Sequence, residues 1–346
     1  MKAVVKYGAE NNMVELRDMP VPEIGSGDVL LRVKACGICG SDIEMWRGFS
    51  SSPTHLPVIM GHEFCGVIDK TGAKVKAFKP GDRVVSETSA YICGKCYFCK
   101  TGDYNLCPDR LGYGYGTDGA FTGYVKVRED ILHPIPEGIS FEEAAITEPV
   151  CVAYNALIVR SRIKPGDTVV IIGPGPIGLN CVQIAKVSGA GKIVIIGTDA
   201  DSARLEVAAT IGADIIINAE KENTVMQVMD LTEGLGADLV VDTAGSSTTL
   251  KQSIEMVRRL GQITKIGWGP EPVNFSLDPL ILKAVTFQGS YGHSWNTWKN
   301  VLRLMHAGKV TTKPLISHIL PITEWEKGYG LVESKEAIKV ILKPVN

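Results

Sequence analysis

The sequence predicts an α/β protein with two domains, and three observations lead to this prediction. The 346 residues are enough for about two domains of ordinary size. Up to about residue 140, short apolar runs alternate with Pro- and Gly-containing turns, as in β-rich domains. Beyond that point, continuous apolar strands alternate with helical patterns, which is typical of a doubly wound parallel sheet covered on both faces.

Charge and composition exclude several classes of protein. The chain carries 36 basic and 38 acidic residues, a net charge of −2, so it lacks the positive field that holds nucleic acid or anionic membranes. No apolar stretch approaches the roughly 20 residues of a membrane span. The N-terminus has neither the long apolar core nor the cleavage site of a signal peptide. These features predict a cytoplasmic protein that acts on small molecules.

Apolar runs bounded by turn residues predict the strands, and spaced apolar residues predict the helices. In the first part, strands are expected at 29–35 and 66–68, followed by a helix from about 142 toward 162. The second part is expected to contain, in order, strand 169–172, strand 193–196, helix 203–211, strand 215–217, strand 239–241, helix 248–259 and strand 263–266. A strand at 340–342 closes the chain.

Four cysteines lie within 15 residues, at Cys93, Cys96, Cys99 and Cys107. Four thiolates close a tetrahedral zinc site and leave no open position, so such a site is structural. The spacing differs from the ferredoxin patterns that hold iron–sulfur clusters. The alternative is four unrelated buried cysteines. Because the chain has only nine cysteines in all, their clustering favours zinc in a reducing compartment.

A second group of potential metal ligands is spread along the chain. It consists of Cys39, His62, Glu63 and Glu148. Cys, His and carboxylate are ligands that zinc prefers, and an incomplete protein shell leaves room for water or substrate. Such a zinc would lower the pKa of an alcohol oxygen. Each residue alone is weak support, since a lone Cys or His is usually structural. Cys36 competes with Cys39, and spacing does not separate them.

The predicted strand at 169–172 is followed by the pattern G-x-G-x-x-G, and a helix follows the pattern. The fingerprint residues are Gly173, Gly175, Pro176, Ile177 and Gly178. The glycines permit a tight turn, a close approach of backbone to a pyrophosphate, and close packing of helix on strand. The helix N-terminus attracts phosphate. A glycine turn without any cofactor is the alternative, but a strand before the pattern and a helix after it favour dinucleotide binding.

An acidic residue stands where such proteins bind the ribose. Asp199 follows the next predicted strand, 21 residues after Gly178. A carboxylate there accepts hydrogen bonds from the ribose of NAD and repels the 2′-phosphate of NADP. NAD is therefore expected in preference to NADP. Arg204, five residues farther on, is a candidate cofactor contact that would soften this preference.

Together, these motifs resemble the zinc-containing medium-chain dehydrogenase/reductase superfamily over essentially the whole chain. The segments that carry the resemblance are G-I-C-G-S-D at 37–42, G-H-E at 61–63, the four-cysteine segment and the glycine fingerprint. The resemblance implies a GroES-like catalytic domain at 1–152, with a structural zinc lobe at about 90–110. It further implies a Rossmann domain at 153–289, and a return to the catalytic domain at 290–346.

The resemblance also implies roles for single residues. It assigns the catalytic zinc to Cys39 and not Cys36, together with His62, Glu63 as ligand or neighbouring carboxylate, and Glu148. Ser41 is implied as the start of a proton relay, and Ile266 as a cofactor contact. The expected cofactors are two zinc ions per chain and NAD. The expected assembly is a homo-oligomer, either a dimer or a homotetramer.

Two branches of the superfamily compete for the substrate. Glu148 followed by Pro, with Ser41, resembles the polyol dehydrogenases, whereas the segment from Gly289 to Trp298 resembles L-threonine 3-dehydrogenase. Both branches usually have His where this chain has Glu44. The expected reaction is oxidation of a secondary alcohol of a polyol or sugar alcohol by NAD, giving a ketone and NADH. Alternatives are L-threonine, sugar phosphates, sugar acids and cyclitols, or, in another class, a non-catalytic NAD-binding protein.

Overall fold

The chain folds into two compact units. The computed structural model describes residues 1–49, 54–269 and 271–345. One unit, here called the catalytic unit, comprises Met1–Glu148 and Ser294–Asn346, and the other, the nucleotide unit, comprises Pro149–His293.

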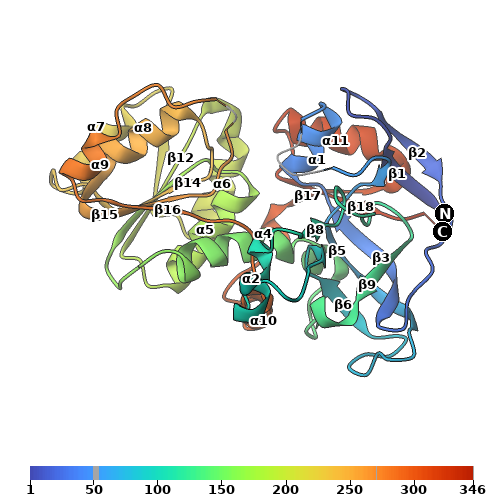
Figure 1. The fold of residues 1–346 in the computed structure, drawn as a ribbon. Coiled ribbons are helices and arrows are strands. Elements are labelled where there is room, and N and C mark those ends of the chain that lie inside the picture. The colour runs from blue at the N-terminus through green and yellow to red at the C-terminus, as the bar shows by residue number, and fades with distance from the viewer. Residues whose placement is uncertain (50–53, 270, 346) are drawn as a thin grey trace. The chain divides into compact units, whose positions relative to one another are not determined.

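The catalytic unit is built mainly from antiparallel strands (Figure 1). Its strands are β1 (Lys2–Lys6), β2 (Val14–Asp18), β3 (Asp28–Gly37), β4 (Val58–Ile59), β5 (Glu63–Thr71), β6 (Arg83–Ser86), β7 (Ser89–Tyr91), β8 (Leu111–Gly112), β9 (Tyr124–Arg128), β10 (Leu132–Pro134), β17 (Ile316–Pro321) and β18 (Lys339–Lys343). A seven-stranded sheet has the order β10-β6-β5-β3-β18-β17, with β9 also on β3. Strand β18 therefore joins the C-terminal part of the chain to the N-terminal part.

Short helices fill the connections of the catalytic unit. They are α1 (Gly40–Trp46), α2 (Tyr97–Thr101), α3 (Phe141–Ala145), α10 (Trp295–His306) and α11 (Trp325–Glu333). The core of this unit lies under the large sheet and contains the inward side chains of β3, β5 and β18, including Leu31, Phe64 and Val340. Alternation of buried and exposed residues along the strands explains why this half of the sequence shows short apolar runs.

The nucleotide unit contains a six-stranded parallel sheet with helices on both faces (Figure 1). Its elements are α4 (Thr147–Tyr154, which begins in the catalytic unit), β11 (Thr168–Ile172), α5 (Pro176–Val187), β12 (Lys192–Gly197), α6 (Ser202–Ile211), β13 (Ile215–Asn218), α7 (Thr224–Leu231), β14 (Ala237–Asp242), α8 (Ser247–Met256), β15 (Val257–Lys265), α9 (Asp278–Leu282) and β16 (Thr286–Gly289). The strand order β13-β12-β11-β14-β15-β16 reverses direction between β11 and β14. That reversal is the place where doubly wound sheets bind dinucleotides. The predicted α/β fold class is confirmed.

Two helices were predicted too long. The helix expected from about 142 to 162 is broken into α3, α4 and a π-helical turn at Asn155–Val159, because Ile146 leaves helical geometry with φ −98° and ψ 27°. The helix expected at 248–259 ends at Met256. There Val257 begins β15 by pairing with Ala237 of β14, so sheet pairing outweighs local helical preference. In the part of the chain that the structure describes, no helix has the length and apolarity to cross a membrane.

Candidate functional site

Cys39, His62 and Glu63 form one group of ligand atoms. Their sulfur, ring nitrogen and carboxylate oxygen all lie within 4.8 Å of one another. Strands β3 and β5 bring them together, since Gly37 at the end of β3 pairs with Glu63 at the start of β5. A Cβ atom on Gly37 would lie 2.5 Å from Glu63 Oε2, so only glycine leaves room for that carboxylate. The set of donors suits zinc.

The carboxylate of Asp42 lies next to two of these residues, Cys39 and His62. Its buried carboxylate accepts a hydrogen bond from the Cys39 backbone amide at 2.9 Å and lies 3.7 Å from His62 Nδ1. Burial alone would lower the pKa of His62, but the charges of Asp42 and Cys39 raise it well above its usual value. At 3.7 Å this carboxylate acts on the His62 ring through its charge.

Glu63 makes a buried ion pair that the sequence did not reveal. Lys339 Nζ lies 2.5 and 2.6 Å from the two carboxylate oxygens of Glu63 and donates to the Ile38 carbonyl at 2.8 Å. Neither side chain of the pair is more than 2% exposed. Burial raises the pKa of Glu63, against the opposing charge of Lys339. Lys339 therefore balances the charge of one candidate ligand.

Glu148 and Ser41, two further predicted site residues, are not part of the group formed by Cys39, His62 and Glu63. Glu148 lies in the first turn of α4, and its charge raises the pKa of His62, of Glu63 and of Lys339. Ser41 lies in the first turn of α1, next to the helix cap Cys39. On the same helix, burial raises the pKa of Glu44, which brings this carboxyl closer to the range useful for proton transfer.

The second group of ligand atoms contains Cys93, Cys96, Cys99 and Cys107, which also lie within 4.8 Å of one another. Backbone amides point at the sulfurs, from Cys96 to Cys93 Sγ at 3.3 Å and from Cys99 to Cys96 Sγ at 3.5 Å. Hydrogen bonds from Lys95 and Cys96 amides lower the pKa of Cys93 to about 7. Such amide donors stabilise thiolates, so the four residues fit a structural zinc.

The four remaining cysteines are core residues. Cys36, Cys65, Cys151 and Cys181 are buried. Burial raises the pKa of Cys36, Cys65 and Cys181, which makes their thiols poor ligands and poor nucleophiles. Cys36 lies in β3, whereas Cys39 lies beyond the strand in the ligand group. The structure thus separates the two cysteines that spacing alone left open.

The glycine fingerprint forms a tight turn between β11 and α5. Gly173 has φ +98°, a conformation that side chains disfavour. A Cβ on Gly178 would lie 1.9 Å from the Gly173 carbonyl oxygen, so helix and turn touch through backbone. Gly175 caps α5, and Pro176 is its first residue. Ile177 follows in the first turn, where free amides point toward the turn.

Asp199 is exposed at the carboxyl end of β12, and other charges surround it. Its carboxylate pairs with Lys221 at 2.6 Å and accepts from Asn218 at 2.7 Å, while its amide donates to Glu220 at 2.7 Å. Arg204 instead lies 3.5 Å from Asp201. The cation beside Asp199 is therefore Lys221, which sequence reasoning missed because it follows the next strand.

Comparison with known proteins shows the family of the chain. The model for the alcohol dehydrogenase GroES-like domain matches residues 25–137, and the model for zinc-binding dehydrogenases matches residues 176–307. The chain is 40% identical, over 100% of both chains, to sorbitol dehydrogenase from Halalkalibacterium halodurans. The chain belongs to the zinc-containing medium-chain alcohol dehydrogenase family. As a member of that family it is an oxidoreductase.

Other relatives of this alcohol dehydrogenase carry different names. D-arabitol-phosphate dehydrogenase from Enterococcus avium is 36% identical over 99% of this chain and 97% of its own. L-threonine 3-dehydrogenase from Bacillus licheniformis is 35% identical over 99% of both chains. Among solved structures, alcohol dehydrogenase TADH from Thermus sp. ATN1 has a TM-score of 0.90, 35% identity and full coverage of both chains. The relatives thus support the family and leave several alcohol substrates open.

Trp298 of this alcohol dehydrogenase is a packing residue. Trp298 of α10 is 1% exposed, and its ring stacks on His133 with centroids 5.7 Å apart and planes 9° apart. His133 Nε2 in turn lies 2.9 Å from Glu87 Oε1. These contacts lie within the catalytic unit and explain Trp298 by packing, without a ligand.

Proposed function

We propose that this dehydrogenase oxidises a secondary alcohol of a polyol or sugar alcohol. The substrate gives a hydride to the nicotinamide of NAD and a proton from its hydroxyl to solvent, so that a ketone, NADH and a proton are formed. The observation that carries this proposal is the group of Cys39, His62 and Glu63, on which the charge of Glu148 also acts. A carboxylate beside the ligand group supplies an acceptor for a second, neighbouring hydroxyl.

The proposed catalytic metal would be held by Cys39, His62 and a carboxylate of Glu63 or Glu148. When bound, zinc supplies a positive charge that lowers the pKa of an alcohol oxygen. The charge of Asp42 acts on His62, and Lys339 holds Glu63 in place. We assign the first proton transfer to the hydroxyl of Ser41, which can accept a hydrogen bond from the substrate and donate one onward.

Glu44 replaces the usual histidine as the next proton carrier in this proposal. It lies on α1 together with Ser41, and its side chain is exposed to solvent. Partial desolvation raises the pKa of its carboxyl, so protonation costs less free energy than for a fully hydrated glutamate. A carboxyl of this kind can take up a proton and release it to solvent.

We further propose that NAD is preferred over NADP. Asp199 and Glu220 place two carboxylates next to each other at the carboxyl end of β12, against the single cation of Lys221. A 2′-phosphate would face net negative charge there, whereas ribose hydroxyls would find acceptors.

The substrate proposal is tested by following NADH formation with a panel of polyols and L-threonine, using the zinc-loaded protein and NAD or NADP. We expect turnover of at least one polyol, no turnover of L-threonine, and a higher kcat/KM with NAD. Turnover of L-threonine alone would overturn the polyol proposal and favour the relatives of that name. If only phosphorylated, acidic or cyclic substrates react, the polyol proposal is likewise overturned.

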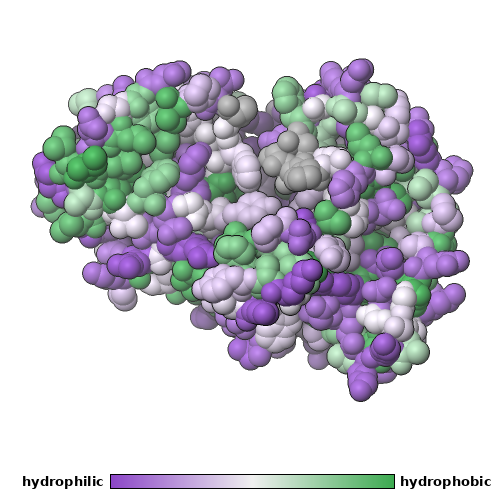
Figure 2. All heavy atoms as spheres, in the orientation of Figure 1, coloured by the Kyte–Doolittle hydropathy of each residue, from purple (hydrophilic) through white to green (hydrophobic). Residues whose placement is uncertain are grey.

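We propose that the protein forms homo-oligomers through the nucleotide unit. Apolar side chains gather over the part of this unit that carries α9 (Figure 2). Leu260, Ile281 and Leu282 are 75%, 79% and 71% exposed. Beside them, β16 is the edge strand of the parallel sheet. An exposed apolar patch beside an open sheet edge is typical of an interface between copies.

This interface predicts a clear change in mass in solution. The substitution Ile281→Asp places a charge in the middle of the apolar patch, and we expect it to convert the oligomer to monomers in light-scattering measurements. Val21→Asp is the matched control, because Val21 is an exposed apolar residue of the catalytic unit, and it should keep the wild-type mass. Unchanged mass for Ile281→Asp would contradict the proposed interface.

A further inference from the structure

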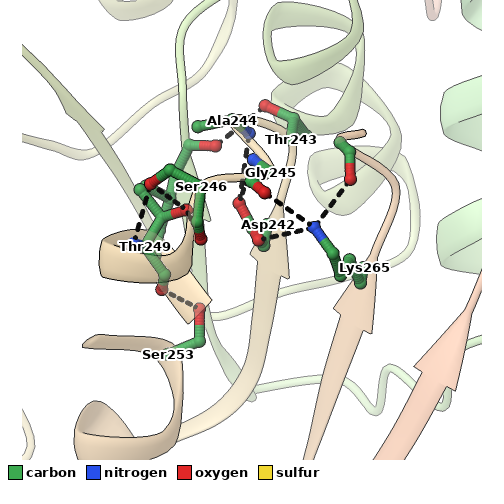
Figure 3. A network of polar contacts seen from close by, with 10 residues as sticks. Asp242, Thr243, Ala244, Gly245, Ser246, Thr249, Ser253 and Lys265 are labelled. Carbon is green, nitrogen blue, oxygen red and sulfur yellow. Dashed lines mark hydrogen bonds and ion pairs between the residues drawn. The ribbon is translucent and has the colours of Figure 1, made fainter. Parts of the chain in front are cut away.

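Two charged residues end neighbouring strands of the nucleotide unit. Asp242 is the last residue of β14 and Lys265 the last residue of β15, and the two are paired in register. Figure 3 shows them between the loops that follow these strands, at 243–246 and 266–269. Ligands of parallel sheets bind at this carboxyl edge.

The pair ties both loops together. The buried Asp242 accepts hydrogen bonds through Oδ1 from the amides of Ala244 at 3.1 Å and Gly245 at 2.9 Å. Lys265 Nζ lies 3.5 Å from Asp242 Oδ2 and donates to the carbonyls of Gly245 at 3.2 Å and Gly267 at 2.7 Å (Figure 3). A single ammonium group thus bonds one carbonyl from each loop.

The two loops also touch through their backbones. A Cβ on Gly245 would lie 2.3 Å from the Trp268 carbonyl oxygen, and one on Gly267 would lie 2.5 Å from the Gly245 nitrogen. Close packing of this kind leaves neither loop free to shift without the other. Ile266, a predicted cofactor contact, donates its amide to the Asp242 carbonyl at 2.9 Å, so its position depends on the same network.

The first loop is continuous with the glycine fingerprint. Thr243 Oγ1 lies 2.8 Å from the carbonyl oxygens of both Ile172 and Gly173. A Cβ on Gly173 would lie 2.9 Å from that hydroxyl oxygen. The network of Asp242 and Lys265 is therefore connected, through Thr243, to the turn that binds pyrophosphate in this class of sheet.

The strand order decides which part of a dinucleotide lies over these loops. The fingerprint follows β11, where the order of strands reverses, and Asp199 follows β12 on one side of it. A ligand with its adenosine ribose at Asp199 and its pyrophosphate at the fingerprint must extend over β14 and β15 on the other side. The loops at 243–246 and 266–269 then support the nicotinamide half.

We propose that Lys265 is a positioning residue: together with Asp242 it holds the two loops in the shape that receives the nicotinamide half of the cofactor. This inference rests on the proposed nicotinamide cofactor and goes beyond it by assigning a role to a charge that the reaction does not use. Lys265 acts through the backbone of the loops, because its ammonium group interacts with their carbonyls and with Asp242.

The test compares binding of the whole cofactor with binding of a part. In the full-length protein, dissociation constants for NADH and for ADP-ribose, which lacks the nicotinamide ring, are measured by calorimetry. For Lys265→Met we expect NADH to bind about tenfold more weakly, the effect of losing a charged hydrogen-bond network, and ADP-ribose to change by less than about threefold. Lys265→Arg keeps the charge and should restore most of the affinity for NADH.

Controls separate this role from general loss of stability. Lys251→Met removes an exposed lysine of α8 and should leave both constants unchanged. Asp242→Asn changes the other member of the pair and should show the same selective loss of NADH affinity. The test therefore does not depend on the folding of a single variant. Equal weakening of NADH and ADP-ribose in both variants, or no weakening of either, would overturn the inference. Failure of the wild-type protein to bind NADH or NADPH would overturn the proposed function with it.

Discussion

The Cys39→Ala variant is expected to lose catalysis while keeping its fold. Without the thiolate, the group around His62 and Glu63 has one ligand fewer, and zinc content should fall from two ions per chain to one. A metal that stabilises developing charge contributes several kcal/mol, so turnover of the preferred alcohol should drop by about a thousandfold or more. The measurements are steady-state kinetics, zinc content and melting temperature.

Cys36→Ala is the matched control for this prediction. Cys36 is buried in β3, three residues before Cys39, and lies outside the ligand group. Its replacement should leave both zinc ions and most of the activity. Cys96→Ala should also lose one zinc, but chiefly at the expense of stability or assembly. Normal turnover and two zinc ions in Cys39→Ala would show that the catalytic assignment is wrong.

The Lys339→Met variant should be strongly destabilised. Its ammonium holds both oxygens of Glu63 in a site with almost no solvent. Removal of one member of a buried pair leaves an uncompensated charge and costs about 3–5 kcal/mol of unfolding free energy. Denaturant titration measures this cost, and the double variant Glu63→Gln/Lys339→Met should recover part of it because the buried charge is gone.

Lys343 offers an exposed counterpart on the same strand. It pairs with Glu142 at 2.6 Å, and its side chain is 47% exposed. Lys343→Met should therefore cost less than about 1 kcal/mol, as exposed ion pairs usually do. If Lys339→Met and Lys343→Met lose equal stability, burial does not explain how much the Glu63–Lys339 pair contributes to stability.

Local patterns in the sequence predicted much of this molecule. The fingerprint at 173–178 and the cysteines between 93 and 107 depend on residues close together in the chain, and the structure places each set as one compact feature. The parallel sheet was predictable because its strands are buried on both faces and hence continuously apolar. The predicted ends of the helices failed where neighbouring strands decide the conformation, as at Val257.

Lys339 and Lys221, which sequence reasoning missed, have partners that are distant in sequence. Lys339 is the first residue of an otherwise apolar stretch of β18, and the pairing of β18 with β3 brings it to Glu63. Lys221 reaches Asp199 because β13 lies beside β12. A lone lysine in either segment carries no pattern that names its partner. The sequence offered one signal for Lys339, namely a charged residue at the start of an apolar stretch.

The pairing of β18 with β3 has a consequence for how the protein is made. The four-cysteine group spans only 15 residues, so a nascent chain can complete it as soon as that segment leaves the ribosome. Glu63 gains its ion-pair partner only when a lysine 276 residues downstream has been synthesised. Because chains fold from the N-terminus during synthesis, the four-cysteine group can be assembled early, whereas the group around Glu63 reaches its charge-balanced form only after Lys339 has been translated. A ribosome that stalls before residue 339 would leave a chain with the complete four-cysteine group but without the lysine that pairs with Glu63.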